Sequence, residues 1–389
     1  MKDKINATNS SVISVIDEFD YSTQNEAYNE KFRQWRSNKN NPFAFNYKKD
    51  LKETVFSDSK GFVNTTVAEA EKQTVTGIMQ ILGVAMLLAV FMDSFFSRLL
   101  ILILDTIGVD IHCDFFTNAF YGGGSEVVGM TVLNSFLCIL TPMIYLHYKL
   151  KLPFRVEVMS KVNSSSEVLN SIALTLMACT VVCLPTAYSG ESHDIYEFFM
   201  TGQSDDISLW EQSDFMLFFV FNILILPIFS ELLFRGAIFA ALRQFGDIFA
   251  IIISSLTACL MTRDLTEMPA ALLISVVAAI GMLRSGTIIT AFFVRIIHRM
   301  YSAALMLLSV DSTVQSLVNR NTFMLAAFIA GAVVFCALYL VRRSKKQNYL
   351  SFYKPHTSSL RRYGTALASF PFSLIAGICV LEAVLELLV

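Results

Sequence analysis

Residues 78–104 read IMQILGVAMLLAVFMDSFFSRLLILIL, a long apolar run in which only Asp93 and Arg98 are charged. A helix needs about 17 to 25 apolar residues to cross a hydrocarbon core, and this run is long enough. Its residues do not alternate between apolar and polar, as those of a transmembrane strand would. Similar runs recur along the chain, and only 16% of all residues are charged, against about 25% in an average soluble domain. The sequence therefore predicts an all-α, polytopic integral membrane helical bundle.

The apolar runs predict about eight or nine transmembrane helices. They lie near residues 78–104, 127–148, 168–188, 215–242, 247–262, 268–284, 286–308, 322–341 and 364–389. We expect a membrane helical domain at 74–389. Residues 1–73 are polar, with Asn- and Ser-rich stretches and nearly balanced charge, so we expect a largely disordered cytoplasmic segment with a short helix near Val67–Gln73.

The charges of the loops orient these spans, because cytoplasmic loops are enriched in Lys and Arg. The loops at 149–161 and 342–362 contain many Lys and Arg residues, whereas those at 105–126 and 189–214 contain none. Nine spans with the N-terminus in the cytoplasm place both basic loops inside and both acidic loops outside. We expect an integral membrane protein of a bacterial plasma membrane, with its N-terminus in the cytoplasm.

One motif places charge inside an apolar span. Residues 227–236 read PIFSELLFRG, so Glu231 and Arg235 are four residues apart on one face of a helix and are expected to form an ion pair. A charge in the middle of a span costs at least about 2.5 to 3.5 kcal/mol on insertion scales. Such residues either neutralise each other within a bundle or mark a functional site.

This motif resembles the first motif of the CPBP family, which includes the CAAX prenyl proteases, bacteriocin-processing (Abi-like) proteins and other intramembrane endopeptidases. There a Glu-Glu-x-x-x-Arg core is usually followed by Gly. Two downstream stretches, Ile252–Leu256 and Leu283–Ile288, resemble the lead-ins to the second and third family motifs at the appropriate spacing. The resemblance covers about 215–305. It implies a hydrolase acting on a hydrophobic or prenylated peptide, with zinc or another divalent metal as the cofactor by family analogy alone.

The family's catalytic residues are mostly replaced in this chain. By register, the first Glu falls on Ser230, the Phe and His of the second motif fall on Ala258 and Thr262, and the His and Asn of the third fall on Arg295 and Arg299. Only Glu231 and Arg235 retain the family identities, and they are the two candidate catalytic residues. His298 lies three residues past the expected position. The residues themselves indicate no cofactor, because no His lies with Asp or Glu at zinc-ligand spacing inside a span.

Arg295 lies close to the middle of its predicted span and requires an acceptor. The candidate acceptors inside spans are Glu231, Asp93, Glu382 and Glu386. In one hypothesis Glu231 is shared by Arg235 and Arg295 in a structural cluster. In the other, the surplus positive charge binds an anionic group such as a lipid head group or a peptide carboxylate.

Three functions agree with these observations. The first is a catalytically impaired relative, a pseudoenzyme that acts in binding or in bacteriocin-type peptide processing or immunity. The second is an active, divergent intramembrane protease that uses Glu231. The third is a transporter or a lipid-binding membrane protein, although the Gly- and Pro-interrupted repeats of a transporter are lacking. The lipid bilayer is the expected partner, and the formal net charge of -2 gives no indication of a nucleic-acid partner.

Overall fold

The computed structural model is nearly all helical. It describes residues 13–14, 19–22, 26–36, 47–49, 55–57, 61–63, 67–113, 120–159, 161–189, 211–308, 313–342, 349–355 and 357–388. Most of the 1–73 segment and of the acidic loop at 189–214 lie outside these residues. The expected disorder of that segment and the domain boundary at residue 73 therefore stay predictions.

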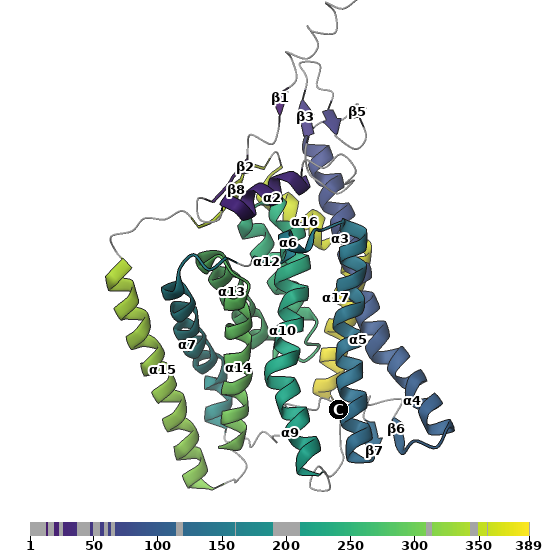
Figure 1. Cartoon of the computed structure of the whole chain (residues 1–389), viewed down its shortest axis with the longest axis vertical. Helices are drawn as coiled ribbons and strands as arrows, with labels where there is room; N and C mark the ends of the chain where they lie inside the picture. The colour runs from purple at the N-terminus through teal and green to yellow at the C-terminus, as the bar shows by residue number, and fades with distance from the viewer. Residues whose placement is uncertain are drawn as a thin grey trace, which may run out of the picture.

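The long helices form a bundle with two distinct ends (Figure 1). They are α3 (Val67–Phe91) continued by a π-helical turn (Met92–Phe96) and α4 (Ser97–Thr106), α5 (Gly124–Leu150), α7 (Ser165–Ser189), α9 (Gln212–Val220) continued through α10 (Leu226–Glu231) to α11 (Phe239–Leu242), α12 (Asp247–Leu260), α13 (Met268–Ser285), α14 (Ile289–Leu307), α15 (Val314–Arg342) and α17 (Phe370–Leu388). Helices α3, α5 and α17 pack together, as do α7, α13, α14 and α15. Helix α3 begins at Val67, where a short helix leading into the first span was predicted.

Short elements lie at the two ends. The upper end in Figure 1 carries α2 (Glu26–Arg36), α6 (Phe154–Glu157), α16 (Ser359–Leu367) and the antiparallel pair β2 (Phe19–Asp20) and β8 (Phe352–Tyr353). It also carries the four-stranded sheet of β1 (Ile13–Ser14), β3 (Tyr47–Lys49), β4 (Val55–Ser57) and β5 (Gly61–Val63). The lower end carries the antiparallel pair β6 (Ile111–Cys113) and β7 (Phe120–Gly122).

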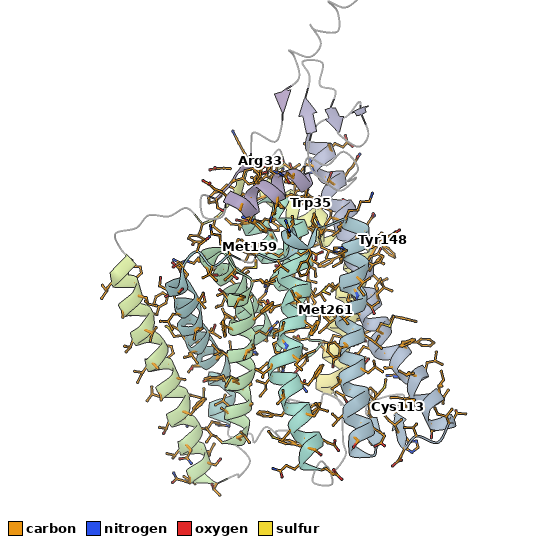
Figure 2. All side chains as sticks on the ribbon, in the orientation of Figure 1. Arg33, Trp35, Cys113, Tyr148, Met159 and Met261 are labelled. Atoms are coloured by element: carbon orange, nitrogen blue, oxygen red, sulfur yellow. The ribbon has the colours of Figure 1, made fainter. Side chains whose placement is uncertain are left out.

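The two basic loops lie at the same end of the bundle. The loop after α5 contains α6, and the loop after α15 contains β8, and both are at the upper end with α2. Figure 2 places Trp35 and Tyr148 at this end and Cys113 at the other. The two basic loops therefore share one end of the bundle, and strands β6 and β7, which belong to the loop without Lys or Arg at 105–126, lie at the other end. That the upper end faces the cytoplasm stays a prediction.

The number of candidate spans among the described residues is smaller than the predicted eight or nine. Within the described residues, six helices are long and apolar enough to cross a membrane, or seven if α16 and α17, bent by 71°, form one span. The count of eight or nine is not confirmed. Two predicted spans account for the difference: α12 is only 14 residues long, and α14 carries Arg295 and Arg299 within its apolar sequence.

Helices α12 and α13 form a hairpin that enters the bundle from the upper end. Helix α12 packs on α13, and Figure 2 places Met261, in their connection, about half-way down the bundle. A 14-residue helix is about 21 Å long, which is too short for a hydrocarbon core of about 30 Å. Thr262, the last residue of the predicted span 247–262, therefore follows a helix that is too short to cross the core.

Helix α2 covers the upper end of the bundle. Tyr28, Phe32 and Trp35 follow one another at spacings of four and three, which places them on one face of the helix, and all three are buried. The Tyr28 hydroxyl donates to the Val156 carbonyl at 2.9 Å, and the Trp35 indole donates to the Leu150 carbonyl at 3.3 Å. These contacts attach part of the polar N-terminal segment to the membrane helices.

Candidate functional site

The first motif lies where the central helix changes its geometry. Glu231 is the last residue of α10, and a π-helical segment, Leu232–Ile238, carries Arg235. π-Helical turns are rare and are frequent at functional sites. The Arg235 Nε lies 3.3 Å from the Glu231 Oε2, and both side chains have 0% exposure. The ion pair predicted from the spacing is present.

A second cation approaches the same carboxylate from another helix. Arg295, on α14, donates from Nε to the Glu231 Oε1 at 3.1 Å, and its side chain is 11% exposed. Helix α14 packs directly on α10, which brings the two groups together. Glu231 is thus shared by Arg235 and Arg295, one guanidinium group on each carboxylate oxygen.

The two guanidinium groups extend the cluster to the α12–α13 hairpin. Arg235 donates from Nη1 to the Ser254 hydroxyl and from Nη2 to the Ser275 carbonyl, both at 2.7 Å. The Arg295 Nη2 lies 3.5 Å from the Ser275 hydroxyl. Ser254 belongs to the stretch that resembles the second family lead-in, whereas Ser275 was not singled out from the sequence. The cluster therefore joins α10, α12, α13 and α14.

The side chains at the other motif positions make local contacts. The Ser230 hydroxyl donates to the Pro227 carbonyl at 2.9 Å, and the Thr262 hydroxyl donates to the Cys259 carbonyl at 2.6 Å. Each is hydrogen-bonded within its own helical turn. Ala258 is buried in the core, and Arg299 follows Arg295 by one turn of α14. Of the substituted positions, only Arg295 is seen to contact Glu231 within the described residues.

The electrostatics of the site favour a fixed carboxylate. Both oxygens of Glu231 face cations, and the side chain has no exposed surface through which water can reach it. One carboxylate with two guanidinium groups leaves one surplus positive charge. The arrangement joins four helices through one buried carboxylate, whose Oε1 accepts a hydrogen bond from Arg295 and whose Oε2 lies within ion-pair distance of Arg235.

A metal ion does not fit this cluster. Zinc is held by Cys, His or carboxylate ligands, and here the Glu231 carboxylate faces two cations. Across the part of the chain that the structure describes, no three His, Cys, Asp or Glu side chains are grouped to hold a metal ion.

A second charged cluster lies at the tip of the hairpin. Arg263, next to Thr262, forms an ion pair with Asp93 and lies 3.4 Å from the Glu382 Oε2. The Asn134 amide donates to the other Asp93 oxygen at 2.7 Å. Asp93 and Glu382 had been candidate acceptors for Arg295, and the structure assigns them to Arg263 instead. Arg263 was not singled out from the sequence because it lies between two predicted spans, where a basic residue is expected in a loop.

The comparison with protein families gives one match. The model of the family described as type II CAAX prenyl endopeptidase Rce1-like matches residues 212–301, less than half of the chain. This match confirms the resemblance to the CAAX protease group, and its bounds are close to the predicted 215–305. No curated protein and no solved structure matches the chain.

Proposed function

We propose that this membrane protein, whose core resembles CAAX prenyl endopeptidases, binds a hydrophobic or prenylated peptide without hydrolysing it. The observation that carries the proposal is the position of the Glu231 carboxylate, which is fully buried between Arg235 and Arg295. The family match at 212–301 and the apolar helices support a membrane protein of this class. Loss of hydrolysis and retention of binding are the parts that are proposed.

The chemical argument rests on what peptide hydrolysis requires. A group must take a proton from water near neutral pH, and another must stabilise the oxyanion. Glu231 is the only family carboxylate left, and two guanidinium groups already engage its oxygens. Ser230 and Thr262 carry hydroxyl groups that donate to backbone carbonyls and have no basic partner there. Arg235 and Arg295 are suited to stabilising an anion, and the motif positions Ser230, Thr262 and Arg299 carry no side chain that takes a proton from water near neutral pH.

The choice of ligand rests on the resemblance. The family acts on prenylated or otherwise hydrophobic peptides, so a relative that keeps the core without the catalytic groups is expected to bind the same class. A role in bacteriocin-type peptide processing or immunity is a narrower form of this proposal. An active divergent protease remains the rival, and it requires Glu231 to act as the base despite its two cationic neighbours.

The test measures binding and cleavage on the same sample. The purified protein in lipid nanodiscs is incubated with a farnesylated peptide that carries a photoreactive group, and the cross-linked peptide is analysed by mass spectrometry. We expect saturable cross-linking, competition by unlabelled farnesylated peptide, and recovery of the peptide at full length. The matched non-prenylated peptide is the control. Recovery of a cleaved peptide would contradict the loss of hydrolysis, and equal labelling by the control peptide would contradict prenyl binding.

A further inference from the structure

A small basic cavity lies at the upper end of the bundle, away from Glu231. It is formed where the first turns of α3 approach α16, and its volume of about 10 Å³ is enough for one water molecule. Three cations line it, Lys72 from α3 and Arg361 and Arg362 from α16. The hydroxyl residues Thr357 and Thr365 also contribute to its walls.

The one carboxylate beside this cavity already has hydrogen-bond partners. Glu71 accepts from the Tyr353 hydroxyl at 3.1 Å and from the Thr357 hydroxyl at 2.9 Å, and it has no exposed surface. With Glu71 included, the residues that line the cavity carry a net charge of about +2. The cavity thus attracts anions more strongly than cations.

Arg362 is held in a fixed position with part of its guanidinium group unused. Its Nη1 donates to the Phe245 carbonyl at 3.0 Å, and the guanidinium group stacks over the Phe249 ring at 5.0 Å. The residue is 8% exposed, and among the described residues its Nε has no hydrogen-bond partner. Its fixed charge adds to the positive potential of the cavity.

The cavity lies at the boundary between polar and apolar surface. On α3, Lys72 precedes the apolar run that begins near Val75. Helix α16 has a strongly amphipathic sequence and turns away from α17 by 71°. Leu360, Leu367 and Phe370 expose large apolar side chains on or beside α16. An amphipathic helix of this kind lies in the plane of a membrane interface, with its basic residues at the depth of the head groups.

We propose that the mouth of this cavity binds the phosphate group of an anionic phospholipid. Lys72 and Arg361, both exposed, supply the charge at the mouth, and the guanidinium group of Arg362 lies behind them in the lining. Basic pockets between transmembrane helices bind such head groups, and charge-assisted hydrogen bonds to phosphate oxygens are strong. The phosphate lies above the cavity, because the cavity admits only water, and the acyl chains lie along the exposed apolar residues of α16.

Lipid titration with matched variants tests this site. The full-length protein in neutral detergent is titrated with dioctanoyl phosphatidylglycerol, and in parallel with dioctanoyl phosphatidylcholine and inorganic phosphate, and bound lipid is followed by native mass spectrometry and thermal unfolding. We expect phosphatidylglycerol to bind most tightly, and Lys72→Gln or Arg361→Gln to weaken its binding about five-fold each. Lys354→Gln removes an exposed charge near the same end that does not line the cavity, and it should change binding little.

The outcomes separate lipid binding from simpler explanations. Equal affinity for the two lipids, or an equal effect of Lys354→Gln and Arg361→Gln, would show that the cavity selects no head group and would overturn the proposal. Binding of inorganic phosphate as tightly as phosphatidylglycerol would also overturn it, because it would show a free-anion site that makes no use of the apolar residues of α16.

Discussion

Glu231 and Arg295 are separated by 64 residues in the chain, yet the Arg295 Nε donates to the Glu231 Oε1 at 3.1 Å. The contact joins α10 to α14 inside the bundle, where a single charge would be poorly solvated. Arg235 engages the other carboxylate oxygen from one turn further along the central helix. The carboxylate therefore compensates two cations at once, and this determines how its removal should affect the protein.

Removing Glu231 alone should destabilise the protein more than removing the whole cluster. Glu231→Leu leaves two guanidinium groups facing each other without a counter-ion, and breaking a buried pair typically costs about 3 to 5 kcal/mol. The triple change Glu231→Leu, Arg235→Met and Arg295→Met replaces the charges with apolar groups of similar size and should recover much of that loss. Thermal unfolding in detergent is the measurement. Equal losses in the single and triple variants would show that Glu231 compensates neither arginine.

Removing the Trp35 side chain should detach α2 from the bundle. Trp35 is 3% exposed and donates to the Leu150 carbonyl, and truncation of a buried Trp typically costs about 3 to 5 kcal/mol. Trp35→Ala should therefore make the N-terminal segment sensitive to proteases under conditions in which the parent protein resists them. Gln34→Ala, at an exposed position of the same helix, is the control. Identical cleavage patterns for both variants would indicate that α2 does not dock through Trp35.

Glu157, on α6, should make the stability depend on pH. Burial raises the pKa of this carboxyl above its ordinary value of 4.5, and the hydrogen bond with His147 offsets part of the effect. Because the folded pKa is the higher one, the unfolded chain loses its proton first as pH rises. The stability that the protonated Glu157 carboxyl contributes is complete below about pH 4.5 and is lost as pH rises through the folded pKa.

Glu157→Gln removes this titration and keeps a similar side-chain shape. Its melting temperature in detergent should vary less than that of the parent protein between about pH 4.5 and pH 7. If the melting temperatures of the parent protein and of Glu157→Gln change equally across this range, Glu157 makes no such contribution.

The topology is tested by thiol accessibility in a background without native cysteines. Asp110→Cys, close to β6, should react with an impermeant thiol reagent added outside intact cells. Lys354→Cys, beside β8, should react only after permeabilisation, because the basic loops are predicted to be cytoplasmic. Both positions are exposed, so burial does not confound the comparison. Labelling of Lys354→Cys from outside would reverse the predicted orientation.

The sequence predicted the helical membrane fold and the central ion pairs because both depend on simple properties. Long apolar runs locate helices, and a charge inside such a run requires a partner. The spacing of Glu231 and Arg235 predicted their contact, and Arg295 required an acceptor among a few carboxylates. The charge of the loops predicted which loops share an end of the bundle.

Other features depend on tertiary structure and were not predicted. Arg263, in the connection between α12 and α13, is paired with Asp93 and Glu382, which belong to helices far away in the chain. Helix α2 lies in a segment predicted to be largely disordered from its Asn and Ser content, although Tyr28, Phe32 and Trp35 were a periodic indication of an amphipathic helix. Neither set of contacts can be read from local sequence alone.

The central claim is that Glu231 is a structural anion and does not activate water. It is tested most directly by the turnover of a farnesylated CAAX peptide by the purified protein, with and without added zinc, compared with Glu231→Gln. The account predicts no turnover above that of empty nanodiscs for either protein, and none for Ser230→Glu, because the motif positions at Thr262 and Arg295 still lack histidine. Metal-stimulated or metal-independent turnover by the parent protein that disappears in a folded Glu231→Gln variant would contradict the claim and identify Glu231 as the general base of an active protease.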